Sequence, residues 1–408
     1  HAGEKIDLGA IVLPFDRDLI RYGSYTHPSI SAKRQRMFNT TPGGSFDTEI
    51  ELPGPLESAR LVSRFKTIDL QVEDTHQTTT VHTHSPLHTL TIKVPPATPY
   101  DMYTLETRFK GAGGGQICVR EPLPEAFAIA GVSHMNTWGQ QTSEYLARVA
   151  ELVQLAGARA LLIANEVNAA YIAGALKELR IPYAITAGNH TMARWDDFFP
   201  QRCQALDDGP MRIVSFSNEI TASWSEARDL LIARKDATAR ILLCYEAFPP
   251  LDLIRDGRVK LLFDGHSGEN HPQRGQFPPR TLHMRAPSYE SVRWISMTHD
   301  GLAPSLLSPE DVPSLRVPRE GNLPLRVEFS AANNGTARAL TARIINETGI
   351  RFPGARVRLV LRAGNYTVSG AKVLQAFHSD DGKVTVIDVE TEARTAPATE
   401  IVVRDSPR

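Results

Sequence analysis

Residues 182–190, Pro-Tyr-Ala-Ile-Thr-Ala-Gly-Asn-His, decide the fold class of this 408-residue chain. A run of apolar or small residues followed at once by a Gly-Asn-His turn is typical of a short buried strand that ends in a polar loop. A helical pattern over 169–179 precedes this strand, and another strand-like run, Ala160–Ala164, precedes that helix. Short buried strands that alternate with helices indicate a sheet covered on both faces, so the sequence predicts an α/β fold.

The same alternation runs through the middle of the chain. The predicted helices cover residues 143–156, 169–179 and 225–234. The predicted strands cover residues 127–132, 160–164, 182–186, 212–216, 240–245 and 259–263, with 282–286 and 292–297 as closing strands. This pattern begins after Pro124 and ends near residue 306, which predicts one α/β domain over residues 125–306.

We expect β structure on both sides of that domain. Residues 1–124 contain alternating segments, such as Leu90–Val94, between Pro and Gly clusters, which predicts an N-terminal β-rich domain. Residues 307–324 are rich in proline and are predicted to form a linker. Residues 325–408 contain strand-like runs separated by Asn-Gly and Asp-Gly turns, which predicts a small C-terminal Ig-like β-sandwich.

Composition is that of a soluble globular protein, with 41% hydrophobic and 22% charged residues. A formal net charge of -1 gives no reason to expect nucleic acid as a partner. No apolar run is long enough for a transmembrane segment, and three scattered cysteines suggest neither a disulfide framework nor a zinc knuckle. The chain opens with His-Ala-Gly, as a mature form does after removal of a signal peptide, so we expect an extracytoplasmic (periplasmic or secreted) protein.

Polar side chains follow the predicted strands at the point where each strand ends. They are His134, Asn165, Asn189, His190, Asp264 and His266. Because the carboxyl ends of parallel strands meet at one edge of a sheet, we expect these side chains to line a common cleft.

The order of these strand-end motifs resembles that of the calcineurin-like metallophosphoesterases, the superfamily of the purple acid phosphatases. That family carries Asp-x-His, Gly-Asp, Gly-Asn-His, a lone His and Gly-His-x-His at successive strand ends. Gly188-Asn189-His190 and Gly265-His266 are the clearest matches, and the likeness covers nearly all of residues 125–306. The resemblance implies a four-layer α/β sandwich and the hydrolysis of a small-molecule or polymer phosphate ester.

The resemblance also implies a set of site residues. The implied metal ligands are His134, Asn165, Asn189 and His266, and the implied catalytic residue is His190, which in the family assists the leaving group or binds the phosphate. Residues that could supply a substitute ligand are Cys244, Glu246, Asp264 and His271.

The metal-binding motifs of this chain are degenerate. Val132 stands in place of the family's first Asp, Asn165 in place of the bridging Asp, and Gly268 in place of the final His. The lone His is replaced by Cys244 or Tyr245, according to the register of the strand. Two divalent ions need oxygen anions to offset their charge, and both carboxylates are absent from the matching positions. We therefore expect one divalent ion (zinc, manganese or iron) or none, rather than two.

Two functions are consistent with these degenerate metal-binding motifs. One is a metal-dependent phosphoesterase with an atypical metal site. The other is a catalytically inactive relative, a pseudoenzyme, that uses the fold and its flanking β domains to bind a protein or surface partner.

Two further motifs have simpler interpretations. Gly265-His-Ser-Gly268 resembles the start of a nucleophile elbow, but the residues that follow contain three prolines and not the helix that such an elbow requires. His82 and His84 lie on one face of a predicted strand, where they could bind a transition metal or form a solvent-facing stripe.

Overall fold

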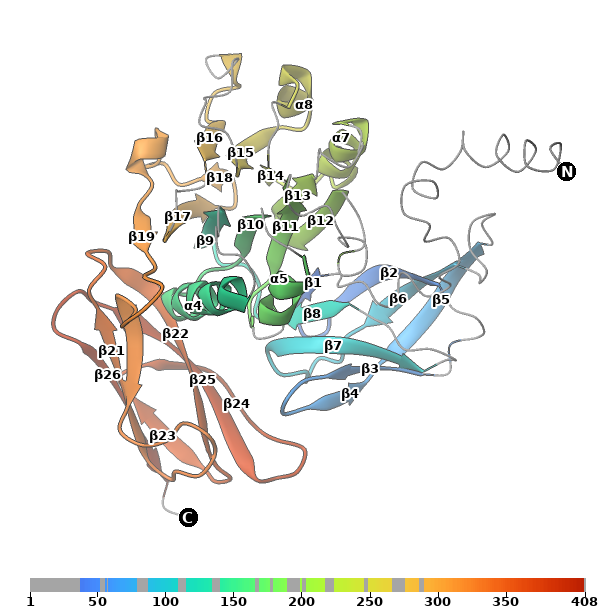
Figure 1. Cartoon of the computed structure of the whole chain (residues 1–408). Helices are drawn as coiled ribbons and strands as arrows, with labels where there is room; N and C mark the ends of the chain where they lie inside the picture. The colour runs from blue at the N-terminus through green and yellow to red at the C-terminus, as the bar shows by residue number, and fades with distance from the viewer. Residues whose placement is uncertain are drawn as a thin grey trace, which may run out of the picture.

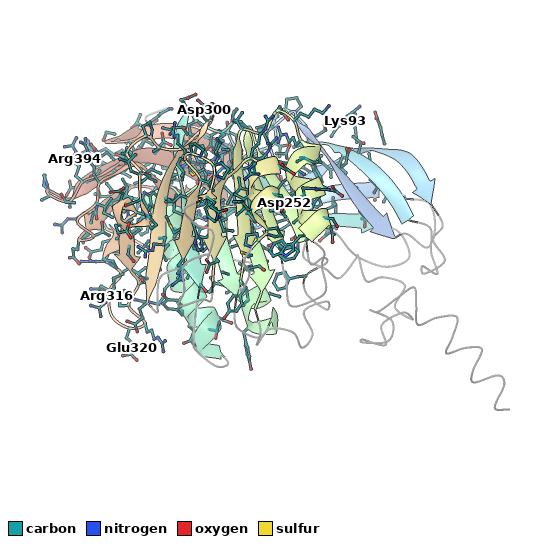
Figure 2. The ribbon with its side chains drawn as sticks, turned by 90° about the horizontal axis from the view of Figure 1, so that it is seen from above. Lys93, Asp252, Asp300, Arg316, Glu320 and Arg394 are labelled. Carbon is teal, nitrogen blue, oxygen red and sulfur yellow. The ribbon has the colours of Figure 1, made fainter. Side chains whose placement is uncertain are left out.

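The computed structural model describes residues 37–51, 56, 58–78, 87–108, 115–133, 140–165, 169–176, 179–188, 199, 203–216, 224–245, 249–265, 276–285 and 290–406. Over these residues the chain is a mixed α/β protein, mostly strand, with several sheets (Figure 1). Seen from above, the N-terminal strands in blue and the C-terminal strands in red flank the central strands (Figure 2).

The middle of the chain forms two sheets. The first has the strand order β11-β10-β9-β17-β18, with β19 also paired to β17. Its strands are β9 (Ala126–Ser133), β10 (Leu161–Asn165), β11 (Tyr183–Ala187), β17 (Ser291–Thr298), β18 (Gly301–Leu302) and β19 (Ser314–Arg316). β9, β10 and β11 are parallel, whereas β17 runs antiparallel to β9.

The second sheet has the order β12-β13-β14-β15-β16. Its strands are β12 (Cys203–Asp208), β13 (Met211–Phe216), β14 (Ala239–Cys244), β15 (Val259–Asp264) and β16 (Leu282–Arg285). β13 to β16 are parallel, and β12 is antiparallel to β13 at one edge. β11 packs against β13 and β14, so the two sheets face each other.

Side chains on β14 alternate between two separate cores. Ile241 and Leu243 lie in the core shared with the first sheet. Leu242 lies in a different core with Ala227 and Leu231 of helix α7 (Trp224–Ala233), and helix α8 (Leu251–Asp256) contributes to this second core too. A strand covered on both faces is apolar at every position, which is why residues 239–244 read as one continuous hydrophobic run.

Helix α4 (Gln140–Ala156) lies next to the first sheet, and α5 (Ala169–Leu176) packs against α4 (Figure 1). α4 also contacts β20 (Leu325–Phe329) and β22 (Phe352–Arg362) of the C-terminal region, so it is enclosed on two sides. Val149, Leu152 and Val153 are fully buried as a result. Burying both sides of a helix in this way joins neighbouring parts of a chain into one core.

The elements predicted for residues 125–306 are found with small shifts at their ends. The strand predicted over 259–263 ends one residue later, at Asp264, and the helix predicted over 143–156 begins at Gln140. Three elements were not predicted: β12, the two-residue strand β18 and the six-residue helix α8.

The N-terminal region contains two antiparallel or mixed sheets. One has the order β1-β8-β7-β3-β4 and the other β2-β6-β5. Their strands are β1 (Met37–Thr40), β2 (Ser45–Glu51), β3 (Ser58–Val62), β4 (Thr67–Asp69), β5 (Gln71–Thr78), β6 (Leu87–Lys93), β7 (Asp101–Arg108) and β8 (Gln116–Val119). Leu61, Ile92 and Tyr103 belong to the buried core of this region.

The C-terminal region consists of two antiparallel sheets, with the orders β20-β21-β26-β23 and β22-β25-β24. Their strands are β20 (Leu325–Phe329), β21 (Leu340–Asn346), β22 (Phe352–Arg362), β23 (Tyr366–Ser369), β24 (Lys372–His378), β25 (Val384–Ala393) and β26 (Thr399–Asp405). Phe352 packs edge-on against Trp294 of β17, with ring centroids 5.1 Å apart. The hydrophobic core is therefore continuous from the central sheets into this region.

The proline-rich segment 307–324 holds the short 3₁₀ helix η3 (Pro309–Asp311) and the edge strand β19. Val312, Leu315 and Val317 are buried. The segment is thus attached to the first central sheet along part of its length. In the part of the chain that the structure covers, no helix has the length and apolarity to cross a membrane.

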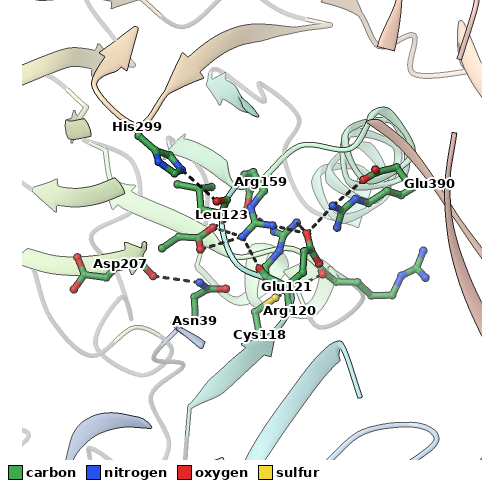
Figure 3. A network of polar contacts seen from close by, with 12 residues as sticks. Asn39, Cys118, Arg120, Glu121, Leu123, Arg159, Asp207, His299 and Glu390 are labelled. Atoms are coloured by element: carbon green, nitrogen blue, oxygen red, sulfur yellow. Dashed lines mark hydrogen bonds and ion pairs between the residues drawn. The ribbon is translucent and has the colours of Figure 1, made fainter. Parts of the chain in front are cut away.

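A buried arginine joins the three regions (Figure 3). Arg159, which precedes β10, donates to both carboxylate oxygens of Asp208, at 3.0 and 2.7 Å from its Nη2 atom. The same guanidinium is paired with Glu121, which follows β8. Arg356 on β22 donates to the same Glu121 oxygen, at 2.6 Å. One carboxylate from the end of the N-terminal region therefore links the central sheets to the C-terminal sheets, and we name these four residues the Arg159 clasp.

Arg159→Met should lower the free energy of unfolding by about 3–5 kcal/mol, because it leaves the buried carboxylate of Asp208 without its partner. Urea denaturation measures this change. The matched control is Arg60→Met, which breaks the exposed Arg60–Glu106 pair and should change stability by less than about 1 kcal/mol. Equal effects of the two substitutions would contradict the role given to the clasp.

The clasp also predicts how stability responds to acid. Burial alone would raise the pKa of Glu121, but Arg120, Arg356 and Arg159 outweigh it and hold the pKa at about 2, below the ordinary 4.5. A depressed carboxylate pKa contributes stability above the unfolded-state value and loses it as the pH falls towards the folded-state value.

Wild-type protein should therefore lose roughly 3 kcal/mol of stability through Glu121 as the pH falls from about 4.5 to about 2. Glu121→Gln should flatten this part of the stability curve, whereas Glu106→Gln should leave it unchanged. Urea titrations between pH 2.5 and 6 compare the slopes, and an unaltered slope in Glu121→Gln would rule out this explanation.

Candidate functional site

The carboxyl ends of strands from both central sheets come together at one edge. Ser133, the last residue of β9, donates from its Oγ atom to the carbonyl oxygen of Gly265 at 2.8 Å, and this bond is buried. Gly265 directly follows β15, and its amide donates to the carbonyl oxygen of Tyr245 at 3.0 Å. The ends of β9, β14 and β15 are therefore held in contact, as expected for a site at the carboxyl edge of parallel strands.

Gly265 lies where these strand ends leave no room for a side chain. A Cβ atom placed on it would lie 2.6 Å from the Cβ of Ala164 on β10, 2.7 Å from the ring of Tyr245 and 2.9 Å from the Oγ of Ser133. Distances this short are not compatible with ordinary carbon contacts. The glycine therefore lets the two sheets approach closely at this edge.

A second contact joins the sheets one strand further along. Thr186 on β11 donates from its Oγ1 atom to the carbonyl oxygen of Phe216, the last residue of β13, at 2.7 Å. The ring of Phe216 stacks on Trp224 at the start of α7, with centroids 4.0 Å apart. These side chains fix the position at which the chain leaves β11 and β13.

Most of the predicted site residues lie outside the described residues: His134, Glu246, Asn189, His190, His266 and His271. They stay predictions. Asn165 is the last residue of β10, in register with Ala187 of β11. Ser133 directly precedes His134 in the sequence, and Gly265 directly precedes His266. Ser133 and Gly265 are hydrogen-bonded to each other.

The structure places the two alternatives for the family's lone His on opposite faces of the sheet. Tyr245 belongs to the core between the two sheets. Cys244 belongs to the core beneath α7 and α8 and is fully buried. Burial, and next the charge of Asp264, raise the pKa of the Cys244 thiol well above its usual range. Since the thiolate is the form that binds metals, this environment disfavours Cys244 as a ligand.

Asp264 occupies the last position of β15 and contacts His283 of β16 through its Oδ2 atom, and both side chains are buried. The Asp264 Oδ1 atom has no hydrogen-bond partner among the residues that the structure describes. Phe277 packs edge-on against the His283 ring at 6.2 Å. One oxygen of the Asp264 carboxylate therefore contacts His283, and the other has no hydrogen-bond partner among the described residues.

His283 was not among the predicted site residues. The pairing of β15 with β16 brings it beside Asp264, because Leu262 is in register with His283 and Asp264 with Arg285. Strand pairing of this kind is not encoded by local sequence periodicity. The one sequence signal for His283 was its place on the predicted closing strand 282–286.

The described residues include two positions of the family's two-metal centre, Val132 and Asn165, and neither carries the family's carboxylate. Val132, which stands at the position of the first Asp, is fully buried and apolar. Over the described ranges, no three His, Cys, Asp or Glu side chains lie close enough together to hold a metal ion. Hard divalent ions need several oxygen ligands, at least some of them anionic.

Comparisons with known proteins give distant likenesses. No family model matches the chain, and no curated protein matches its sequence. GAP50, the anchor in the inner membrane complex of Plasmodium, has 9% identity and a TM-score of 0.31, over 55% of this chain and 86% of that one. A conserved uncharacterized protein of Streptococcus pneumoniae, described as a predicted phosphoesterase, has 10% identity and a TM-score of 0.24, over 48% of this chain and 99% of that one.

A glycosyl hydrolase family 2 member from Bacteroides cellulosilyticus has 8% identity and a TM-score of 0.28, over 89% of this chain and 77% of that one. All three TM-scores lie below 0.5.

Gly265→Ala should lower the free energy of unfolding by about 1–3 kcal/mol, because the added methyl group must displace Ala164, Tyr245 or Ser133. The matched control is Gly174→Ala on α5, where nothing lies within 4 Å of the added atom. The control should raise stability by up to about 1 kcal/mol, since alanine favours helix over glycine. Urea denaturation separates the two, and a neutral Gly265→Ala would show that the strand ends are not closely packed.

Proposed function

We propose that this chain is a metallophosphoesterase-like protein that binds phosphate esters at the carboxyl edge of its two facing sheets and lacks the two-metal hydrolysis of that family. The observation that carries the proposal is the contact of Ser133, Gly265 and Tyr245, which gathers strand ends from both sheets at the edge where such folds bind ligands. The loops that leave this edge carry the Gly-Asn-His and Gly-His motifs.

The layering of the central region supports the fold assignment. Helices α7 and α8 lie against one sheet, α4 lies next to the other, and the sheets face each other. This order of helix, sheet, sheet and helix is the one expected of a four-layer metallophosphoesterase-like sandwich. The C-terminal pair of antiparallel sheets is the arrangement expected of an Ig-like domain.

The residues at the matching positions support binding over two-metal catalysis. In two-metal phosphatases the ions stabilise both the attacking and the leaving oxygens. Here the first Asp position is the buried Val132, and Cys244 is a fully buried residue of the core on the helix side of the sheet. His190 and Asn189 would contact the phosphate as neutral or cationic hydrogen-bond donors, which is sufficient for binding.

The second candidate is a phosphoesterase with one divalent ion. The observation that favours it is Asp264, whose Oδ1 atom has no described hydrogen-bond partner and lies at the end of β15. A carboxylate oxygen is a ligand that zinc, manganese and iron accept. The remaining ligands would come from His134, Asn165, Asn189 and His266.

The location and the partners of the protein stay proposals. We include an extracytoplasmic location in this proposal, and the β-rich regions offer surfaces for a protein or surface partner. We expect no nucleic-acid partner, because the formal net charge is -1.

Phenylphosphonate, a phosphate-ester analogue that resists hydrolysis, should bind the full chain with one saturable site in isothermal titration calorimetry. His190→Ala should abolish this binding. His299→Ala is the matched control, because His299 contacts Glu125 and Leu123 and should leave the binding unchanged.

The same preparations distinguish the two candidates. The proposal predicts no metal above trace by elemental analysis and no turnover of an aryl phosphate with added Mn²⁺ or Zn²⁺. Turnover that His190→Ala or Asn189→Ala removes would establish the one-metal enzyme instead. Absence of both binding and turnover would refute both candidates.

A further inference from the structure

A polar hollow of about 440 Å³ lies where the N-terminal, central and C-terminal regions meet. It is lined by residues from all three regions: Arg64, Phe65, Asp101, Met102, Leu179, Arg180, Asn333, Arg358 and Val360. A second cavity of about 80 Å³ shares Asp101, Arg180 and Arg358 with it. Concave sites at domain junctions with a few convergent polar groups are the usual places for small ligands.

The charges around the hollow do not balance. Its lining contains three arginines and one acidic residue, Asp101. That carboxylate accepts a hydrogen bond from the Nη1 atom of Arg358 at 2.7 Å. Arg358 is further paired with Asp388 at 2.8 Å, so it needs no other anion. Two carboxylates, Asp101 and Asp388, therefore face the three arginines, and one net positive charge remains beside Arg64 and Arg180.

Neither of these two arginines has an ion pair among the residues that the structure describes. The guanidinium of Arg64 lies over the ring of Phe65, 5.2 Å from its centroid. Arg180 is anchored through its backbone: its amide donates to Gln154 Oε1, and its carbonyl accepts from the Cys118 thiol at 3.8 Å. Its side chain lines the hollow, where burial and next the charge of Arg358 lower its pKa, while the charges of Asp388 and Asp101 act in the opposite direction.

The turn that carries Arg64 is held in place by the C-terminal region. Lys66 is paired with Asp380 at 2.9 Å, and the amide of Thr67 donates to the same carboxylate at 2.7 Å. Phe65 packs edge-on against Phe377, with centroids 6.4 Å apart. A cation fixed in this way loses little freedom when a ligand binds, which favours affinity.

We propose that this hollow binds a small molecule that carries two or more negative charges, as phosphate or carboxylate groups, between Arg64 and Arg180. Arginine suits either group because its planar fork donates two parallel hydrogen bonds. The bound anion would connect the N-terminal region to the central region, beside the Arg358 pair that already joins the N- and C-terminal regions. The site is separate from the proposed phosphate-ester site, since Arg180 precedes the amino end of β11 and the proposed site lies at the carboxyl ends.

The test titrates the full chain with pyrophosphate and, separately, with citrate, in isothermal titration calorimetry at matched ionic strength. Wild-type protein should show one saturable site for at least one of the two, and the ligand that binds identifies the phosphate or the carboxylate class. Arg64→Gln and Arg180→Gln should each weaken the binding by about tenfold or more, the usual effect of losing a hydrogen bond to a charged group. Arg228→Gln is the matched control, because Arg228 is an exposed residue of α7 outside the hollow.

Thermal unfolding gives a second readout. Without anion, Arg180→Gln should melt at the wild-type temperature or above it, because the substitution removes a positive charge that is repelled by Arg358. With saturating ligand it should melt below wild type, because the ligand stabilises only the form that binds it. His190→Ala should leave this binding intact, which separates the hollow from the carboxyl-edge site. Absence of saturable binding of both ligands, or equal weakening by Arg228→Gln, would overturn the proposal.

Discussion

Arg159 is held between two carboxylates that come from different parts of the chain, and the arrangement of the three regions depends on it. Its guanidinium donates to Asp208 at the edge of the second central sheet and is paired with Glu121 at the end of the N-terminal region. Glu121 in turn accepts a hydrogen bond from Arg356 of the C-terminal sheets. A charge this deeply buried is tolerated only where its partners are fixed, so the partners themselves become fixed. Apolar packing extends the same connection, since α4 shares one core with the first sheet and also contacts β20 and β22.

The two proposed binding sites lie at different ends of the central sheets. At the carboxyl edge, Gly265 and Ser133 bring strand ends of both sheets into contact. Near the amino end of β11, the meeting of three regions creates a hollow in which arginines outnumber acids. Neither site belongs to one sheet or one domain. Each exists because separate segments are held at a fixed distance, which is what the Arg159 clasp and the shared core provide.

Hydrophobic periodicity in the sequence was sufficient to predict most strands and helices of the central region, because strands buried on both faces are apolar throughout. The strand from Val259 and the helix ending at Ala156 are examples. It failed at β12, a polar edge strand that pairs on one side with β13, and at β19, which lies in a proline-rich segment. The strand-end positions of the site were predicted from the same pattern. The pairing of Asp264 with His283 was not, since it depends on which strands become neighbours.

The same reasoning explains why the clasp escaped prediction. Arg159 and Glu121 are ordinary charged residues in loops, and nothing local marks either as buried.

The central claim, that the three regions form one rigid unit, is tested most directly by differential scanning calorimetry of the full chain. The account predicts a single transition whose calorimetric and van't Hoff enthalpies agree. Two or three separate transitions, or a calorimetric enthalpy well above the van't Hoff value, would contradict it.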